Sequence, residues 1–285
     1  MAGYVGRFAP SPSGPLHLGS LVAALGSFLD ARANQGRWLV RIEDIDPPRE
    51  MPGASDAILR TLEAFGLHWD DKVRYQSQHH GDYDALLAHL ESQGLLYRCA
   101  CTRKQLKAQG LHQRQHCCPP DKASPAALRF LNEAPLEAFF DRRQGTLTVP
   151  PALAAEDFII HRKDGLYAYQ LAVVSDDIDQ GMTHIVRGSD LIEATVWQLQ
   201  LYRALGAPAC RYLHLPLVLG QDGQKLSKQN HAAPIDDANP LPALRQALGY
   251  LGLATPDTDN KEELLQAAIA QWPYLDDSQP GQARV

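Results

Sequence analysis

The sequence predicts an α/β fold built on a parallel sheet, and three of its features support this prediction. Short apolar segments typical of strands alternate with segments whose apolar residues recur at helical spacing. The connections between these segments are short, which favours strand–helix–strand units with neighbouring parallel strands. The chain of 285 residues is 45% hydrophobic and 21% charged, a globular composition that supplies a substantial core. Together these features favour a doubly wound sheet of the Rossmann type.

Residues 1–97 are predicted to form the first half of this sheet. The first expected elements are a strand within residues 4–10, a helix carrying Leu21, Leu25 and Phe28, and a strand over Trp38–Ile42. A helix follows that is capped by Ser55 and ended by Gly66, with Ile58, Leu62 and Phe65 as its apolar stripe. Another helix is expected from about Asp82 to Gly94. The second strand ends in three carboxylates, Glu43, Asp44 and Asp46.

Residues 98–165 differ from both halves and are predicted to be a subdomain inserted between them. They are rich in Cys, His and Pro, as in "CACTRKQ" and "HQRQHCCPPDKASP". A Cys-x-Cys pair at Cys99 and Cys101, followed by a second pair of thiolates or imidazoles, fits a structural tetrahedral zinc site. The alternative is a group of reduced thiols that bind no metal.

Residues 166–230 are predicted to complete the sheet, and residues 231–285 to form a short helical tail. The expected elements are a buried strand over Tyr169–Val174, a short strand in "THIVRG", a helix over Ile192, Val196, Leu199 and Tyr202 that a capping box of Asp190 and Glu193 opens, and a strand with an Asp-Gly turn in "LPLVLGQDGQKLSKQN".

Composition and charge narrow the classes of function. The net charge of −6 gives no global basic field for nucleic acid, although a local patch can serve on an acidic protein. The N-terminus lacks the pattern of a secretory signal, and no apolar run approaches the roughly 18 residues of a membrane span. Five cysteines, four of them between Cys99 and Cys118, do not make a disulfide framework. We therefore expect a cytoplasmic protein that does not contact a membrane.

The stretch "APSPSGPLHLG" between the first strand and the first helix predicts a phosphate-binding loop. It leads from the carboxyl edge of a parallel sheet into a helix N-terminus, whose unpaired amides and dipole attract phosphate. Gly14 and Gly19 let a ligand approach the backbone, and His17 adds a donor. "KLSK", from Lys225 to Lys228, supplies cations for the same phosphates. The alternatives are a rigid surface loop and a pair of solvated lysines.

Two of these motifs resemble those of a known family. His17–Ser20 ("HLGS") and Lys225–Gln229 ("KLSKQ") are similar to the two ATP-binding motifs of class I aminoacyl-tRNA synthetases. "RFAPSPSGPLHLG", "RIEDID" and "AYQLAVVSDDIDQGMTHIVRGSDL" resemble the glutamyl-tRNA synthetase branch. The resemblance spans residues 7–230, with Ser20, Leu226 and Gln229 as mild departures. It implies a Rossmann-type class I catalytic domain with an inserted subdomain and a short helical C-terminal tail.

A glutamate pocket needs a cation for the side-chain carboxylate and an anion for the α-ammonium. Arg7 and Arg187 are candidate cations, since Arg grips a carboxylate bidentately, and Glu43 is the candidate anion. The alternative for residues 41–46 is a solvated charge cluster at a strand end. The resemblance favours the pocket and implies these glutamate-binding residues: Arg7, Ala9, Ser11, Glu43, Tyr169 and Arg187.

The resemblance also implies adenylation chemistry. ATP carries Mg²⁺ with it, and the glutamate carboxylate attacks the α-phosphate. His17 and Lys228 are then the catalytic residues, which stabilise the phosphates in the transition state. The implied ATP-binding residues are His17, Gly19, Lys225, Ser227 and Lys228.

The short segment after the lysine motif narrows the resemblance further. Only 57 residues follow Lys228, so we expect no anticodon-binding domain. That length resembles the glutamyl-queuosine tRNA(Asp) synthetases, paralogues that attach glutamate to queuosine in the anticodon loop. The implied partners are L-glutamate and tRNA(Asp) carrying queuosine, and we expect a monomer. The alternatives are a shortened glutamyl-tRNA synthetase that charges a 3′ end and a non-catalytic nucleotide- or RNA-binding paralogue.

The zinc ligands are carried over only in part. The family pattern is Cys-x-Cys, then Tyr, then Cys after three residues, and Cys99, Cys101 and Cys117 match it in spacing. The Tyr position holds Gln113, a poor zinc ligand. The candidates for the fourth ligand are His112, Gln113, His116 and Cys118, and the sequence leaves the choice open.

Overall fold

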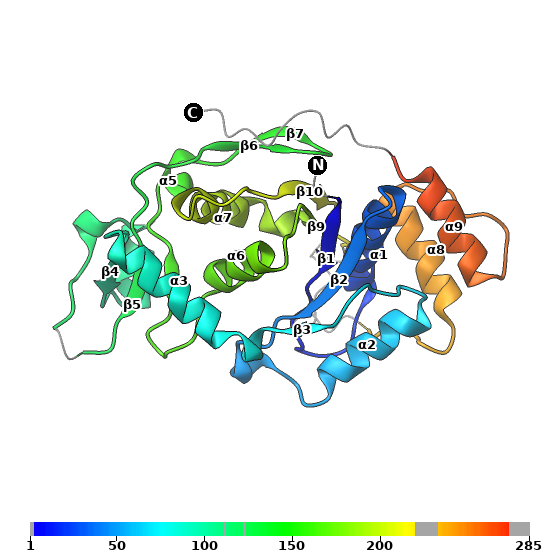
Figure 1. The fold of residues 1–285 in the computed structure, drawn as a ribbon, viewed down its shortest axis with the longest axis horizontal. Coiled ribbons are helices and arrows are strands. Elements are labelled where there is room, and N and C mark those ends of the chain that lie inside the picture. The colour runs from blue at the N-terminus through cyan, green and yellow to red at the C-terminus, as the bar shows by residue number, and fades with distance from the viewer. Residues whose placement is uncertain (1–2, 111, 122–123, 220–232, 274–285) are drawn as a thin grey trace.

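A computed structural model of the chain describes residues 3–110, 112–121, 124–219 and 233–273 (Figure 1). Within these ranges the strands are β1 (Val5–Phe8), β2 (Arg37–Ile42), β3 (Arg74–Tyr75), β4 (Leu96–Cys99), β5 (Ala127–Phe130), β6 (Ala138–Asp141), β7 (Gly145–Thr148), β8 (Ile159–His161), β9 (His184–Gly188) and β10 (Arg211–Leu215). The helices are α1 (Leu18–Ala33), α2 (Ala54–Ala64), α3 (His80–Ser92), α4 (Arg103–Gln109), α5 (Pro151–Ala154), α6 (Tyr169–Asp179), α7 (Ile192–Ala204), α8 (Pro240–Leu251) and α9 (Lys261–Gln271).

Two sheets with parallel pairing form the centre of the molecule. β1, β2 and β3 pair in parallel, and β10 pairs in parallel with both β9 and β6, while β7 adds an antiparallel edge. The two sheets adjoin where β1 runs beside the start of β9, and the amide of Thr183 donates to the carbonyl of Val5 at 3.0 Å. The predicted Rossmann-type α/β fold with parallel strands is confirmed.

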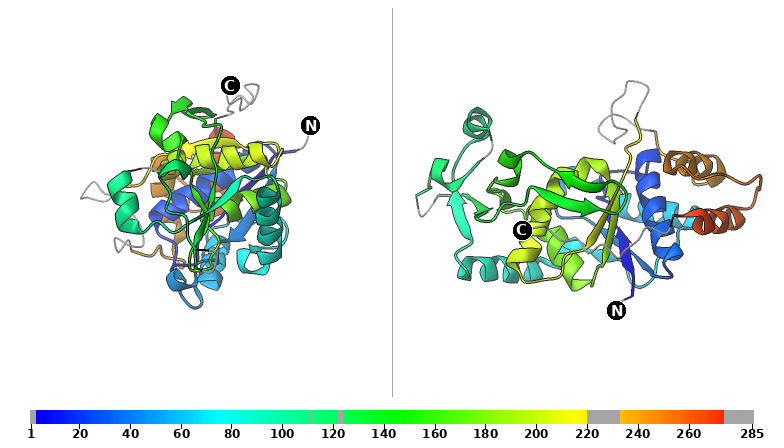
Figure 2. Two further views of the ribbon diagram at one scale, coloured as in Figure 1. Left: turned by 90° about the vertical axis from the view of Figure 1, so that its left-hand side faces the viewer. Right: turned by 90° about the horizontal axis from the view of Figure 1, so that it is seen from above.

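Helices cover both faces of this centre. α1 packs with α8 and α9 on one face, and Gly26 lets it approach β10 closely: a Cβ there would lie 2.6 Å from Cδ1 of Leu215. α6, α7 and α3 enclose a second core. Figures 1 and 2 show α8 and α9 at one end of the elongated molecule and β4 and β5 at the other. The helices expected after residue 231 therefore belong to the core around α1.

One predicted strand is a helix. Tyr169–Val174 was expected to be a buried strand, but these residues open α6. Leu171, Ala172, Val173 and Val174 are all buried, since α6 packs against α3, α7 and β8. A short apolar run of this kind has no periodicity that separates a buried strand from a helix buried on all sides.

Three local predictions are also wrong. α2 is preceded by Gly53 in a left-handed conformation (φ 76°), so Ser55 lies inside the helix instead of capping it. Asp190 lies in a 3₁₀ turn, and α7 begins after Leu191 without a capping side chain. The strand expected in "LPLVLGQDGQKLSKQN" lies earlier in the chain, as β10, and ends at Leu215, because Pro216 has no amide proton for a sheet.

The segment 98–165 contributes to two sheets. β4, β5 and β8 form a separate antiparallel sheet, as an inserted subdomain would. β6 and β7 lie in the same segment but join the sheet of β9 and β10. The insertion as a unit remains a proposal, because β6 and β7, over residues 138–148, belong to the central sheet.

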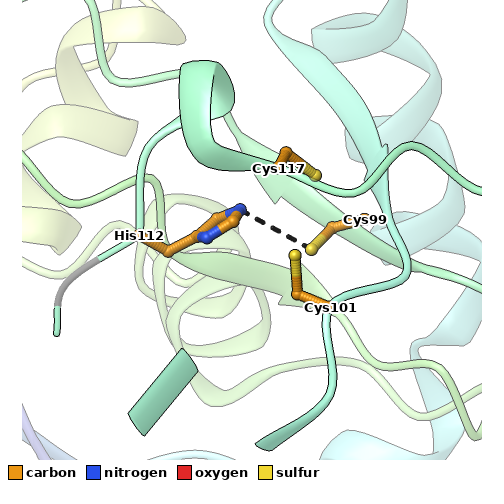
Figure 3. A group of neighbouring side chains, drawn as sticks. All are labelled: Cys99, Cys101, His112 and Cys117. Carbon is orange, nitrogen blue, oxygen red and sulfur yellow. Dashed lines mark hydrogen bonds between the residues drawn. The ribbon is translucent and has the colours of Figure 1, made fainter. Parts of the chain in front are cut away.

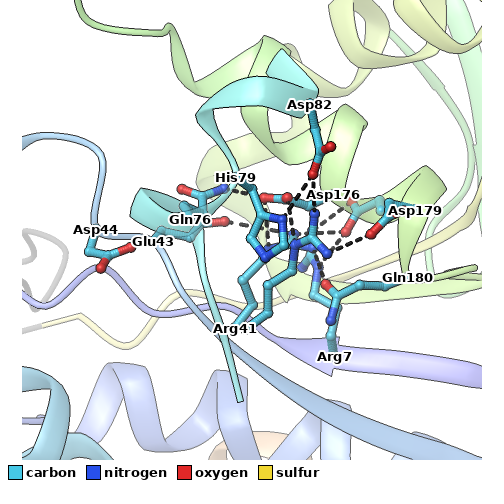
Figure 4. A network of polar contacts seen from close by, with 12 residues as sticks. Arg7, Arg41, Glu43, Asp44, Gln76, His79, Asp82, Asp176, Asp179 and Gln180 are labelled. Atoms are coloured by element: carbon cyan, nitrogen blue, oxygen red, sulfur yellow. Dashed lines mark hydrogen bonds and ion pairs between the residues drawn. The ribbon is translucent and has the colours of Figure 1, made fainter. Parts of the chain in front are cut away.

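A buried ion-pair network joins β1 and β2 to α6 (Figure 4). Asp177 of α6 accepts hydrogen bonds from Nε and Nη2 of Arg7, both at 3.1 Å, and from Nη2 of Arg41 at 2.7 Å. All three side chains are at most 4% exposed. Burial alone would raise the pKa of Asp177, but the guanidinium groups of Arg41 and Arg7 hold it below its usual value.

Asp176, the neighbouring residue, extends the network to the next strand. It accepts from Nε of Arg74 at 2.8 Å, from Nε2 of Gln76 at 2.6 Å and from the hydroxyl of Tyr83 at 3.1 Å. Its carboxylate also lies 3.6 Å from Nε of Arg41. α6 thus presents two buried carboxylates to three strands.

We predict that Asp177→Asn destabilises the protein by about 3–5 kcal/mol, because two buried guanidinium groups lose their common counter-charge. The control is Asp179→Asn on the same helix, since the Asp179 side chain is 60% exposed and pairs with Arg74 at the surface. Its loss should cost about 0–1 kcal/mol. Urea denaturation of both variants measures the difference, and equal effects would contradict the prediction.

Candidate active site

A cavity of about 340 Å³ opens at the carboxyl ends of β1, β2 and β9. Its lining includes every predicted glutamate-binding residue and the two predicted ATP-binding residues of the phosphate loop: Arg7, Ala9, Ser11, His17, Gly19, Glu43, Tyr169 and Arg187. Gly14 of the same loop does not line it. These residues come from distant parts of the sequence, and the fold brings them to one site. Lys225, Ser227 and Lys228, with the predicted Asp-Gly turn, lie outside the described residues.

His17 is the N-cap of α1, which begins directly after it. Its Nδ1 accepts from the amide of Ser20 at 3.3 Å, and Oγ of Ser20 accepts from the amide of His17 at 2.7 Å. This reciprocal pair is a capping box. Since Nδ1 is an acceptor, the neutral ring carries its proton on Nε2, the arrangement that a phosphate oxygen requires. The motif "HLGS" therefore sets both the helix start and the histidine tautomer.

Glu43 presents a poorly compensated carboxylate to the cavity. Its side chain is 9% exposed, and Nη2 of Arg41 lies 3.8 Å from Oε1. No hydrogen bond from the described residues reaches this Oε1. Burial raises the pKa of Glu43 to about 7, although Arg41 and Arg7 oppose the shift. An anion in this position attracts a cationic group such as an α-ammonium.

The two arginines of the cavity are held differently. Asp177 engages Nε and Nη2 of Arg7 and raises its pKa against the opposing effect of burial. Arg187 has no carboxylate partner among the described ion pairs and donates to His214, Thr195 and a backbone carbonyl. Arg187 therefore brings the less neutralised positive charge, as recognition of a ligand carboxylate needs.

Tyr169 lies in the first turn of α6 and lines the same cavity as Glu43 and Arg187. Burial, together with the charge of Glu43, raises the pKa of its hydroxyl. The hydroxyl therefore stays protonated and can donate a hydrogen bond.

The alternative reading of residues 41–46 as a solvated charge cluster is wrong for Arg41. Its side chain is completely buried, and it donates to Asp177 and to Gln180. The carboxylate of Asp46, by contrast, pairs with Arg49 and Arg162 near the surface. The strand end thus divides into a buried part that supports the cavity and a surface part.

Sequence reasoning missed the residues that hold the arginines. Asp177 lies four residues after Val173, on the same helical face. A prediction of a helix here would therefore have indicated that the Asp177 carboxylate is buried. His214 and Thr195, which contact Arg187, carry no motif. The pairing of β9 with β10 reveals His214, and the packing of α7 beside β9 reveals Thr195.

A second cluster lies at the far end of the molecule, beside β4 (Figure 3). The ligand atoms of Cys99, Cys101, His112 and Cys117 lie within 4.8 Å of one another. Nε2 of His112 lies 3.6 Å from Sγ of Cys99. Burial and the neighbouring thiols raise the pKa of Cys117 to about 12, a mutual repulsion that a bound cation would offset. Three sulfurs and one imidazole form a donor set suited to tetrahedral zinc.

The fourth donor of this cluster is His112. Gln113, at the position of the family's Tyr, donates its amide to the carbonyl of Ala155. The backbone amide of Cys118 donates to Sγ of Cys101 at 3.2 Å, and Sγ of Cys118 accepts from Gln105. Cys118 thus supports the cluster from outside, while His112 points into it.

Fold and cavity together define a class I synthetase catalytic domain. A family model described as tRNA synthetases class I (E and Q), catalytic domain, matches residues 4–135 and 120–266. Glutamyl-Q tRNA(Asp) synthetase of Shewanella amazonensis is 56% identical over 269 residues, covering 94% of this chain and 92% of that protein. The Cronobacter sakazakii protein of the same name is 55% identical, with the same coverage. The chain belongs to this class I family and, within it, to the glutamyl-Q tRNA(Asp) synthetases.

Solved structures support the fold. The crystal structure of glutamate-tRNA synthetase from Elizabethkingia anophelis matches with a TM-score of 0.78 at 24% sequence identity. The match covers 94% of this chain and 65% of that chain, so this chain spans less than two thirds of that longer protein. None of the described helices combines the length and apolarity that crossing a lipid bilayer requires.

We predict that Glu43→Gln changes stability in a pH-dependent way. The pKa of Glu43 is about 7 in the folded protein, against an ordinary value of 4.5. The folded state of the natural protein therefore loses stability as the pH rises from 4.5 to about 7, because Glu43 must lose its proton while buried. The variant should therefore gain stability relative to the natural protein across this window, by up to about 3 kcal/mol. Thermal unfolding across this pH range tests it against the control Glu91→Gln, whose side chain is exposed. Equal pH trends in both variants would contradict the assignment.

Proposed function

We propose that this chain activates L-glutamate with ATP as glutamyl-adenylate and transfers it to queuosine in tRNA(Asp). One observation carries the proposal: a single cavity joins an anion, a cation and a helix N-terminus in the arrangement that an amino acid with a second carboxylate and a nucleotide require. Relatives that cover most of this chain and bear the name Glutamyl-Q tRNA(Asp) synthetase agree with it.

The first step forms the adenylate. Glu43 faces the α-ammonium of glutamate, and Arg187, beside Tyr169 and the anchored Arg7, faces its side-chain carboxylate. An α-carboxylate oxygen bonds to the α-phosphorus of ATP, and the bond from that phosphorus to the bridging oxygen of pyrophosphate breaks. In this proposal Ala9 and Ser11 shape the glutamate subsite.

The triphosphate lies at the start of α1. Gly19 and the amides of the first turn receive it, and the helix dipole favours its negative charge. His17 donates from Nε2 to the phosphates as charge develops on them. Lys225, Ser227 and Lys228 are proposed to complete the site from the lysine motif, with Mg²⁺ carried by ATP.

The second step transfers the acyl group. A hydroxyl of the queuosine ring attacks the carbonyl carbon of the adenylate, the bond to the phosphate oxygen breaks, and AMP leaves. The hydroxyl proton passes to solvent or to the leaving phosphate. Single-stranded loops are where proteins read RNA most specifically, so an anticodon-loop base is an accessible acceptor.

We further propose that Cys99, Cys101, His112 and Cys117 hold a structural zinc ion. When bound, the ion would tie β4 to the following loop and supply folding free energy to the antiparallel sheet. It takes no part in the transfer reactions.

Transfer to an isolated stem-loop tests the proposed acceptor. We expect labelled glutamate to appear on an anticodon stem-loop with queuosine and not on the same stem-loop with guanine, and the linkage to survive removal of the tRNA 3′ terminal adenosine. Glutamate-dependent pyrophosphate exchange should also occur without any tRNA. If trimming the 3′ end abolishes labelling while the stem-loop stays unlabelled, the chain charges a 3′ end and the proposal is wrong.

We predict about one zinc ion per chain, and its loss in Cys117→Ser and His112→Ala. His116→Ala, which changes the residue directly before Cys117 but none of the four donors, is the control and should retain zinc. Metal analysis of the purified variants measures this, and chelation should lower the melting temperature of the natural protein. Zinc retained in His112→Ala but lost in His116→Ala would contradict the ligand assignment.

A further inference from the structure

The guanidinium group of Arg187 is held on two of its three nitrogens by groups behind the cavity wall. Nε donates to Nε2 of His214 at 3.2 Å, and Nη2 donates to Oγ1 of Thr195 at 2.7 Å and to the carbonyl of Leu191 at 3.2 Å. The group also lies over the ring of Tyr212, 5.0 Å from its centroid. Nη1 is buried and meets no acceptor among the described residues. It is the nitrogen left for a ligand of the cavity.

His214 is itself held by a buried carboxylate on the neighbouring strand. It pairs with Arg187 in the register of β9 and β10. Oδ2 of Asp141 accepts from the backbone amide of His214 at 2.9 Å and lies 2.8 Å from its Nδ1. Since Nδ1 donates to this carboxylate, the neutral ring presents the lone pair of Nε2 to Arg187. Asp141, His214 and Arg187 thus form a chain from β6 to the cavity.

We propose that His214 is a positioning residue that determines selectivity for a side-chain carboxylate. By accepting from Nε, it rotates the fork of Arg187 so that Nη1 meets the carboxylate of glutamate. The inference rests on the proposed activation of glutamate, and it adds a residue that contacts neither substrate.

The proposal requires a neutral ring, because an imidazolium would repel Arg187 and lose its acceptor. Burial lowers the pKa of His214, and Arg187 acts in the same direction, while Asp141 opposes them. The groups that face His214 from the surrounding elements are Asp141 and Phe139 of β6, Arg187 of β9, Asp190 of the following turn, Thr195 of α7 and Tyr212 of β10. The ring is therefore neutral at physiological pH.

The test measures the ratio of kcat/KM for glutamate to kcat/KM for glutamine by pyrophosphate exchange. Glu43 faces the ammonium that both amino acids share, so only the arginine side of the cavity changes this ratio. We expect His214→Leu to lower the ratio about tenfold or more, as the loss of one charge-assisted hydrogen bond does. His214→Gln, whose amide oxygen can accept from Arg187, should stay within about threefold of the natural ratio. KM for ATP should change in neither variant.

His184→Leu is the matched control, a buried histidine on β9 that does not line the cavity. It should leave the ratio unchanged. Between about pH 6 and pH 8 the natural ratio should also be flat, although both absolute values fall toward pH 6 as Glu43 gains a proton. A ratio that falls steeply toward pH 6 would show that the ring gains a proton there and would overturn the proposal.

The two levels of inference fail separately. A natural protein that does not activate glutamate contradicts the proposed function, and the role of His214 falls with it. An active natural protein with an unchanged ratio in a folded His214→Leu variant contradicts only the role of His214. Equal loss of activity in the His214 and His184 variants, with KM for ATP also altered, indicates a purely structural role and overturns the proposal as well.

Discussion

The pairing of Arg7 and Arg41 with Asp177 is the interaction on which the rest of the site depends. Arg7 comes from β1, Arg41 from β2 and Asp177 from α6, so one carboxylate joins both halves of the molecule. All three groups are buried away from water, so the loss of one partner leaves an uncompensated buried charge. The same contacts determine where β1 and β2 end relative to α6. Glu43 follows β2 and Tyr169 opens α6, so the network sets the distance across the cavity.

The two arginines of the cavity differ in how far their charges are neutralised. Arg7 is neutralised by Asp177, whereas neutral partners hold Arg187, which keeps its charge for a ligand. The carboxylate of Glu43 is buried, and Arg41 lies 3.8 Å from it. Its pKa is raised because burial makes the charged form of Glu43 unfavourable in the folded state. Both features weaken the folded protein and favour a ligand with opposite charges. A functional site is where such local conflicts are expected.

Support for the cavity extends to parts of the chain that look peripheral. The turn between β6 and β7 is held by Asp141, whose Oδ1 accepts from the amides of Arg143 and Gln144 and whose Oδ2 holds His214. α8 and α9 pack on α1, whose first turn carries the capping box of His17. The Cys–His cluster, by contrast, lies beside β4 at the far end, where it can stabilise the antiparallel sheet without touching the cavity.

The sequence by itself determined the elements with strong local signals and the residues that carry motifs. β1, α1, β2, α2, α3, β9, α7 and the cavity residues from Arg7 to Arg187 were predicted, because periodicity, turn residues and family motifs are local properties. β3 and β4 were not predicted. Only the tertiary structure decided that residues 169–174 are helical, since the consecutive buried residues 171–174 leave this stretch without an amphipathic pattern. It likewise selected His112 from four candidate donors, because ligand geometry depends on how the loop folds back on β4. The links from Asp177 to Arg7 and from Asp141 to His214 join residues 170 and 73 positions apart. Contacts at such separations follow from how α6 packs on the strands and from strand order, which no local pattern contains.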